Sequence, residues 1–502
     1  MDVDLTDEQV AAAAQQQAKK PTIVPVDDAH PFDLESYISG YTGRTAIDRL
    51  IHIVKICPAA ATDAFNLAVQ HIHQSRDASL YQALMTEYEH LAENPVVKES
   101  YQLPNPLEIA QLDTKWVDEI SAKNQSDKVK LEVELKTYTN NMIKESIRMA
   151  HRDLAEFYRS IGEYQQSLRH HTKSREFCAT SQHVLDMCLS VLELLIEQRN
   201  YSHLSTYVFK AEAALDATAA SAAGNGGASA TAPASGAGPS TSGTGPNAKK
   251  RAPTEKEIVQ SKLDLASALS HLGQGNHEKA AQSFLRIGGA RELGDWVGKL
   301  VTQSDIAIYG TLCGLASMSR GAIKVQLLDN PAFGLYIEQE PYVRELLEAY
   351  INSNFKTALE LLSRYSTRHY IDIHLSQHVH GLTSLIKNNA VVLYFQPFAS
   401  IKLDRMSQAF GWTVDMVEEH IVNLIQSGEI HGRVDSQNKI LYAKKTDYRG
   451  DLFARTIQAG NDILSANRKV LLRMRLQQAD LIVKAPKGHP QSYGMVQDYY
   501  GE

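Results

Sequence analysis

Cysteine is scarce in this chain, and its few cysteines are widely spaced. The 502 residues contain four of them, with no Cys-x-x-Cys pair: Cys57, Cys178, Cys188 and Cys313. Zinc clusters need closely spaced ligands, and small disulfide-stabilised folds need regular cysteine pairs, so neither is predicted. We expect the four thiols to be buried as small apolar side chains.

Long apolar runs and a basic charge excess are also missing. No stretch approaches the ~18 consecutive apolar residues of a membrane-spanning helix. The first thirty residues are polar and acidic with an Ala/Gln tract, unlike a signal peptide. The formal net charge is -7, so no global positive field gathers nucleic acid or anionic lipid. We therefore expect a protein of the nucleus and cytoplasm with no membrane partner and no direct nucleic-acid partner.

The common catalytic motifs are missing as well. The chain has no P-loop, no dinucleotide-binding glycine fingerprint, no nucleophile elbow and no His-Glu-x-x-His. The tempting pairs are His71-x-His73 and His378-x-His380, but both lie in helical sequence, where residues i and i+2 point to different faces. A zinc isopeptidase of the JAMM type needs a Ser and an Asp at set distances after His-x-His. Those positions hold Tyr81, Leu84, Asn388 and Val391. We expect no catalytic residue, no cofactor and no metal.

Composition marks one clear boundary. Residues 216–254 consist largely of Ala, Gly, Ser, Thr and Pro, which cannot bury enough apolar surface to offset the entropy lost on ordering. This predicts a disordered insertion. The cluster Lys249-Lys250-Arg251 at its end is either a nuclear-import signal or, more commonly for so short a run, solvated surface.

Helical sequence on both sides of the insertion repeats itself. Leu154 to Ser167 aligns with Leu265 to Ala280, with a small residue five positions after the turn glycine in each. Weaker copies turn at Asn200 and Asn354. A small residue there lets the second helix approach the first, as in degenerate tetratricopeptide-like hairpins. The alternative is an unspecific helical bundle, and both are mainly α.

Residues 386–443 have the pattern of a winged helix. A helix ends before Pro397, a second runs from Ser400 to Gly411, and Thr413 caps a third. Two alternating strands follow around the turn 436–438, and their apolar positions are Ile430, Val434, Ile440 and Tyr442.

The third of these helices carries no Lys or Arg. Its polar face offers Asp415, Glu418 and Glu419, which a phosphate backbone would repel. A helix that reads DNA needs cations at these positions. The pattern therefore favours protein assembly over DNA binding.

One more helix is predicted from Asp451 to Lys484. Its apolar positions alternate steps of four and three residues, the spacing of a coiled-coil seam. The seam comprises Phe453, Ile457, Gly460, Leu464, Asn467, Leu471, Met474, Gln478 and Leu481. Gly460, Asn467 and Gln478 weaken the seam as a homodimer zipper. So long a helix favours a bundle with helices of other chains over packing on its own domain.

These observations give a mainly α fold: a right-handed tetratricopeptide-like helical-repeat solenoid, a winged helix and a long C-terminal helix. The expected segments are a disordered tail (1–30), helical repeats (31–215), the insertion (216–254), further repeats (255–365), the winged helix (366–448), the bundle helix (449–484) and a flexible tail (485–502).

Helical repeats that run into a winged helix resemble the PCI family, named for the proteasome lid, the signalosome and initiation factor three. The opening from Asp33 to Thr45, with Arg49-Leu50 and Cys57-Pro58, resembles the signature of the family of COP9 signalosome subunit 1. The run Ile308 to Ala316 is similar to that family too. The resemblance covers roughly residues 31 to 484, apart from the insertion.

The resemblance implies a non-catalytic scaffold in the complex that removes Nedd8 from cullins and so regulates cullin-RING ubiquitin ligases. The isopeptidase site lies in another subunit of that complex. The implied partners are other signalosome subunits, contacted through the winged-helix edge and the C-terminal helix, and cullin-RING ligases through the assembled complex. We assign Ile430, Val434, Ile440 and Tyr442 to the wing. The bundle candidates are Phe453, Ile457, Leu464, Leu471, Met474 and Leu481. The alternatives are a PCI subunit of the proteasome lid and an RNA-associated PCI protein of translation or messenger export.

Overall fold

The computed structural model describes residues 24–101, 103–105, 114–224, 254–444, 448–479 and 481. Almost all regular structure in these residues is helical, with three short strands, so the predicted mainly α class is confirmed. The chain divides into two compact units, one ending at Ile430 and the other beginning at His431. Three of the four cysteines are buried, and Cys178 is half-buried.

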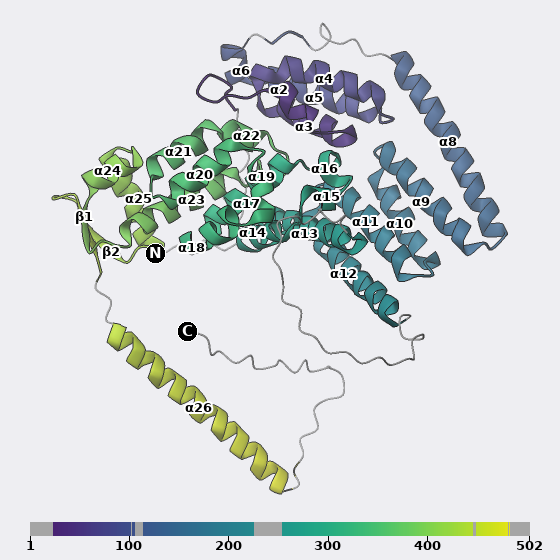
Figure 1. Cartoon of the computed structure of the whole chain (residues 1–502). Coiled ribbons are helices and arrows are strands. Elements are labelled where there is room, and N and C mark those ends of the chain that lie inside the picture. Colours follow the sequence, from purple (N-terminus) through teal and green to yellow (C-terminus); the bar gives the residue numbers. More distant parts are fainter. Residues whose placement is uncertain are drawn as a thin grey trace, which may run out of the picture. The chain divides into compact units, whose positions relative to one another are not determined.

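The first unit opens with a small helical module, drawn in purple in Figure 1. Its elements are α2 (Leu34–Ser39), α3 (Gly43–Ile56), the 3-10 helix η1 (Pro58–Ala60), α4 (Ala61–Gln74), α5 (Ser79–Glu93) and α6 (Pro95–Ser100). Asp33 caps α2 by accepting hydrogen bonds from the backbone N–H groups of Glu35 and Ser36. Leu50, Ile53 and Phe65 lie in one fully buried core that spans the module.

This core corrects the predicted tail at 1–30. Val24 is buried, and its N–H donates to the carbonyl of Ile56 at 2.9 Å. The Thr367 hydroxyl donates to the carbonyl of Pro25. Apolar Val24 and Val26 pack on the core, so the ordered chain starts before residue 31. Residues 1–23 lie outside the described part.

The helical repeats follow as antiparallel pairs. They comprise α8 (Thr114–Asn140), α9 (Lys144–Ser160), α10 (Tyr164–Ser174), η2 (Arg175–Phe177), α11 (Ser181–Glu197), α12 (Tyr201–Gly224), α13 (Glu255–Gly273) and α14 (His277–Arg286). The predicted insertion begins too early, because α12 continues helically through Gly224: residues 217–223 are rich in alanine, the best helix former. Residues 225–253, with Lys249-Lys250-Arg251, lie outside the described part. Thr254 and Glu257 form a capping box that starts α13.

Four hairpin turns share one backbone geometry. The residues Gly162, Arg199, Gly275 and Ser353 each have a positive φ, between 58° and 82°. At each turn the next residue donates its N–H five positions back, for example from Glu163 to the carbonyl of Tyr158. These are the turns that the repeat pattern predicted at Gly162, Asn200, Gly275 and Asn354. The left-handed turn ends one helix and reverses the chain into the next.

The next part of the first unit surrounds α17 (Gln303–Ser317), a helix with nearly every residue buried. The neighbouring elements are α15 (Ala290–Leu293), α16 (Trp296–Lys299), α18 (Arg320–Ala322), the π-helix η3 (Ile323–Leu328), α19 (Pro331–Ile337), α20 (Pro341–Ile351), α21 (Phe355–Arg364), α22 (Ser366–Ile371) and α23 (Val379–Phe395). Because α17 is apolar on all sides, it packs against α14, α19, α20 and α23.

The helical part of the winged helix matches the sequence with one correction. Residues Ser400–Lys402 form strand β1, and the helix predicted to begin at Ser400 begins at Leu403 (α24, Leu403–Phe410). The β-branched Ile401 is buried within the strand, which leaves Lys402 as the cap residue of α24. Gly411 ends α24 in the left-handed conformation, and the Thr413 side chain caps α25 (Val414–Gln426), as predicted.

The second unit contains the wing hairpin and the terminal helix. Strand β2 (Gly432–Asp435) pairs antiparallel with β3 (Ile440–Ala443), and Val434 lies opposite Leu441. The fully buried residue of β3 is Leu441, which the predicted alternation had overlooked, while Ile440 and Tyr442 are half-buried. Helix α26 runs over Tyr448–Gln478 and ends before Leu481, so Leu481 is not on the helix. Residues 485–502 lie outside the described part.

Candidate functional site

A buried arginine that the sequence pattern did not mark as a site links the N-terminal module to the rest of the first unit. Arg49 lies on α3 between Ala46 and Ile53, on the face that packs into the core, and its side chain is fully buried. Burying a guanidinium cation without a partner is strongly unfavourable. Its contacts therefore determine how this part of the fold is built.

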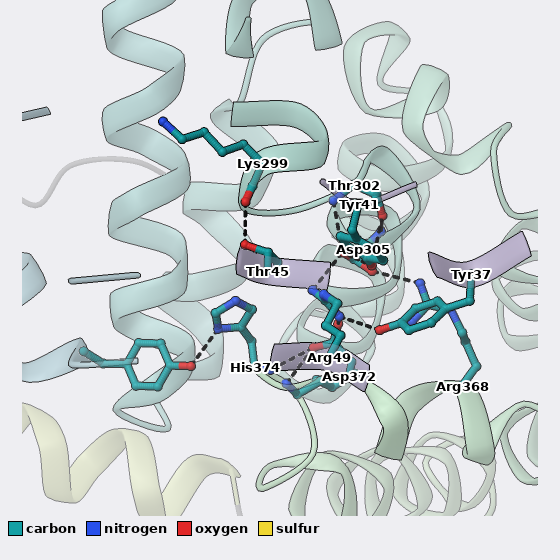
Figure 2. A network of polar contacts seen from close by, with 12 residues as sticks. Tyr37, Tyr41, Thr45, Arg49, Lys299, Thr302, Asp305, Arg368, Asp372 and His374 are labelled. Carbon is teal, nitrogen blue, oxygen red and sulfur yellow. Dashed lines mark hydrogen bonds and ion pairs between the residues drawn. The ribbon is translucent and has the colours of Figure 1, made fainter. Parts of the chain in front are cut away.

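Arg49 joins three segments that are far apart in sequence (Figure 2). Its Nη1 donates to the Asp372 carboxylate and to the Tyr37 hydroxyl, each at 2.5 Å. Its Nη2 donates to the Asp305 carboxylate at 3.2 Å. We call the set of Arg49, Asp305, Arg368 and Asp372 the polar joint.

Both carboxylates of the polar joint are held by neighbouring groups. Asp305 belongs to the capping box of α17 and accepts hydrogen bonds from the Thr302 N–H at 3.0 Å and the Tyr41 hydroxyl at 2.6 Å. Arg368 donates to the other oxygen of Asp305 at 2.8 Å. The Asp372 carboxylate accepts hydrogen bonds from the backbone N–H groups of His374 and Leu375, each at 2.9 Å. Fixed carboxylates allow one arginine conformation to satisfy several groups at once.

Electrostatic interactions keep Arg49 and Asp372 charged. Burial alone would lower the pKa of Arg49, but Asp372 and its other neighbours raise that pKa well above its usual value. Burial raises the pKa of Asp372, yet Arg49 and the other nearby positive groups bring it below its usual value. Two cations balance two carboxylates, so removing one partner would leave an uncompensated buried charge.

Two histidines beside the joint stay neutral. Burial lowers the pKa of His374 to about 4 and that of His369 to about 3. His374 shares a hydrogen bond with the Tyr201 hydroxyl at 2.8 Å, and His369 shares one with the Tyr342 hydroxyl at 3.1 Å. They connect the joint to α12 and α20 without adding charge.

One histidine of each predicted pair packs against another ring. Over the described ranges, no three His, Cys, Asp or Glu residues are arranged to hold a metal ion. His73 packs edge-on against Trp116 with ring centroids 4.9 Å apart. His378 lies beside His277 at the start of α23. These histidines have structural contacts.

A polar cavity of about 700 Å³ lies between α3, α4 and α9 to α11. Its principal cations are already paired: Arg44 with Asp77 at 2.5 Å, and Arg159 with Glu193 at 2.8 Å. These ion pairs leave no evident charge for a ligand, so we assign no binding role to the cavity.

The wing candidates differ in exposure. Ile430 is buried, whereas Val434, Ile440 and Tyr442 are half-buried. Tyr442 faces Arg433 across the hairpin, and the guanidinium lies 5.5 Å from the ring centroid. The hairpin thus presents an amphipathic surface.

The bundle candidates lie along α26 and are exposed. Phe453, Ile457, Leu464, Leu471 and Met474 have between 50% and 68% of their surface accessible. Leu481 is exposed as well, but it follows the helix. Large apolar side chains exposed along one helix in this way are typical of interaction surfaces. No described helix is long and apolar enough to cross a membrane.

Two family models match the chain. The model described as 26S proteasome subunit RPN7 matches residues 113–326, the repeat region. The PCI domain model matches residues 340–445, from α20 to the end of the wing. Neither model describes a catalytic family.

Curated relatives cover most of the chain. COP9 signalosome complex subunit 1 of Arabidopsis thaliana is 31% identical over 456 residues, which is 90% of this chain and 91% of the relative. The chain belongs to the COP9 signalosome subunit 1 family. Subunit 1b of Drosophila melanogaster is 28% identical over 488 residues, covering 90% of this chain and 86% of the relative.

Proteasome proteins are more distant from this member of the COP9 signalosome subunit 1 family. The 26S proteasome non-ATPase regulatory subunit 6 of Dictyostelium discoideum is 18% identical over 425 residues, covering 85% of this chain and 96% of the relative. The shared layout explains why the proteasome model matches the repeats. The family resemblance inferred from the opening at Asp33 is therefore confirmed.

Tyr37, Tyr41 and Arg49 belong to the opening segment that carries the family resemblance, but the sequence alone gives no physical reason for them. The structure supplies one, because Arg49 belongs to the polar joint and the two tyrosine hydroxyls hydrogen-bond to it. A usable signal was an arginine among apolar residues on one helix face, which indicates a buried ionic partner. Nothing in the sequence indicated that Asp305 and Asp372 are those partners.

Proposed function

We propose that this chain is a non-catalytic scaffold subunit of the COP9 signalosome. Membership of the subunit 1 family supports this proposal, and the exposed apolar row on α26 carries it. A helix of 31 residues with its large apolar side chains in water gains most of its stability from packing. Partner subunits would supply that packing.

The family resemblance implies the activity of the whole complex. The signalosome removes Nedd8 from cullins and so regulates cullin-RING ubiquitin ligases, which this chain would meet through the assembled complex. The isopeptidase chemistry belongs to a JAMM-type subunit, so this chain contributes binding surfaces. We place it in the nucleus and the cytoplasm, where cullin-RING ligases act.

Two surfaces are proposed for assembly. Ile430, Val434, Ile440 and Tyr442 would support contacts of the winged helix with a neighbouring subunit. Strand β2, which carries Val434, lies at a sheet edge, where backbone groups are free for pairing. The bundle surface of α26 would comprise Phe453, Ile457, Leu464, Leu471 and Met474, with Leu481 just beyond the helix end. The polar joint would keep the N-terminal module in place while these surfaces bind.

Nucleic-acid binding is disfavoured by α25. Its exposed polar side includes Asp415 and Glu419, and the helix has no Lys or Arg between Val414 and Gln426. Carboxylates at these positions repel phosphates. An RNA-associated PCI protein would instead bind RNA with a steep salt dependence.

The proposal is tested by purifying the tagged chain from its own cells. Its partners are identified by mass spectrometry, and the eluate is assayed for cleavage of Nedd8-cullin. Signalosome subunits together with cleavage support the proposal. Proteasome lid subunits without cleavage would replace it with the lid alternative, and ribosomal or RNA partners would refute both. Chelator-sensitive cleavage by the chain alone would refute the non-catalytic assignment.

A further inference from the structure

Helix α26 is apolar over more than one seam. Its main seam has Ile457, Leu464 and Leu471 at positions a of a heptad, with Phe453 and Met474 at positions d. Ile463 and Val470 fall at the adjacent positions g and are 61% and 55% exposed. Apolar residues at a, d and g make a stripe too wide for one neighbouring helix, so the helix has surface for at least two.

The other flank of the same stripe is basic. Arg468 and Arg475 fall at successive positions e, one heptad apart, and both are exposed. From Ile463 to Gln478 the helix has no carboxylate. Within the part of the chain that the structure describes, neither arginine forms an ion pair within 4.0 Å. Charges at e and g positions select partner helices in coiled coils.

We infer that the flank of α26 that carries Arg468 and Arg475 packs against a helix of another subunit with carboxylates one heptad apart. This inference rests on the proposed function, since it specifies a partner of the same bundle surface. The opposite flank, with Ile463 and Val470, packs against a second, more apolar helix. The charge arrangement thereby fixes which neighbour lies on which side and in which register.

Three alternatives explain the basic flank less well than an acidic partner helix: a helix-dipole role, a homodimer and a membrane surface. Cations near a helix C-terminus stabilise the helix dipole, but this effect falls off within the last turn, which contains Arg475 and not Arg468. A second copy of the chain would bring like charges together and place Gly460 and Asn467 in the seam. A helix lying on a membrane follows a 3.6-residue period, whereas this seam keeps alternating steps of four and three, typical of a supercoil.

Charge reversal with a matched control tests the inference. The full chain is coexpressed with the other signalosome subunits as the wild type, as Arg468→Glu/Arg475→Glu, or as Lys469→Glu/Arg473→Glu. The two double variants change the net charge equally, but Lys469 and Arg473 lie at positions f and c, away from the stripe. We expect the e-position variant to lower recovery in the complex by about tenfold and the control by less than about twofold. Equal effects of the two variants would overturn the inference.

Carbodiimide cross-linking gives an independent result in the assembled complex. Arg468→Lys/Arg475→Lys keeps the charge and introduces amines that couple to carboxylates in contact. Cross-links to Asp or Glu of another subunit's helix are expected from both positions, and none from the native Lys469. Absence of cross-links from both positions, or binding of the wild-type chain to phosphatidylserine vesicles that the e-position variant abolishes, would refute the inference. If the wild type recovers no signalosome subunits, the proposed function itself fails.

Discussion

Arg49 on α3 and Asp372 after α22 lie 323 positions apart in sequence, and their side chains form a fully buried ion pair at 2.5 Å. The pair joins the N-terminal module to the segment that leads into the winged helix. Because Arg49 also reaches Asp305 at the start of α17, one side chain fixes three parts of the first unit. Loss of that side chain should therefore loosen all three.

Arg49→Ala is expected to destabilise the N-terminal module by about 3–5 kcal/mol, because it leaves the buried Asp372 carboxylate without its cation and Asp305 with Arg368 alone. The free energy of opening of α2 and α3 is measured by native-state hydrogen exchange, which resolves local stability in a large chain. Arg344→Ala is the control, since Arg344 is 58% exposed and its contact with Glu348 is 3.6 Å. It should change stability by less than about 1 kcal/mol. Equal effects of the two substitutions would contradict the assigned role of Arg49.

Acid is expected to weaken the first unit from about pH 6.5 downward. Burial lowers the pKa of His374 to about 4 in the folded chain. Between pH 4 and about 6.5, the unfolded chain therefore binds a proton at this histidine that the folded chain does not. Stability is therefore present above pH 6.5 and is lost as the pH falls toward 4, by up to about 1.4 kcal/mol per pH unit for this group. Denaturant unfolding at several pH values measures the slope. His374→Gln should reduce it, and an unchanged slope would refute the assignment.

At the hairpin turns, replacing Gly by Ser and replacing Ser by Gly should have opposite effects on stability. Gly275→Ser places a side chain at φ +77° and is expected to cost about 1 kcal/mol. Ser353→Gly relieves a serine at φ +61° and is expected to be neutral or stabilising by a few tenths to about 1 kcal/mol. Both sites are exposed, which limits other effects. Thermal unfolding of the two variants should show shifts of opposite sign or one shift near zero, and destabilisation by both would be inconsistent with the shared geometry.

Gly162→Ala should cost more than Gly275→Ala. Both glycines have positive φ, but a Cβ at Gly162 would lie 2.3 Å from an Asp77 carboxylate oxygen, whereas Gly275 faces open space. Asp77 also holds Arg44, so its displacement would break an ion pair. Comparing the melting temperatures of the two variants tests this order, and a larger loss for Gly275→Ala would contradict it.

The local elements were largely predictable because their signals are local. Turn residues marked the hairpins at Gly162 and Gly275, and Thr413 marked the start of α25. Two of the four turns use Arg199 and Ser353 in the left-handed conformation, which propensity alone would not suggest. The Asn that follows each of them was the available signal.

Long-range relationships were not predictable in this way. Periodicity gives the buried face of α3 but not the partner of Arg49, since Asp372 lies in a short segment without regular period. Likewise, the alternation of apolar residues did not predict that Leu441 is the buried residue of β3. Its burial is set by tertiary packing, which overrides the local pattern.

Through helix α26, this chain is proposed to join a complex of helices. Leu464→Asp/Leu471→Asp places two carboxylates on the exposed seam, and the stability of the chain alone should not change much because both side chains are already in water. The decisive measurement is recovery of signalosome subunits with the tagged variant, compared with the wild type at equal expression. We predict that the variant loses its partners while its melting temperature stays close to that of the wild type. Unchanged recovery of the subunits would show that α26 does not dock through this seam.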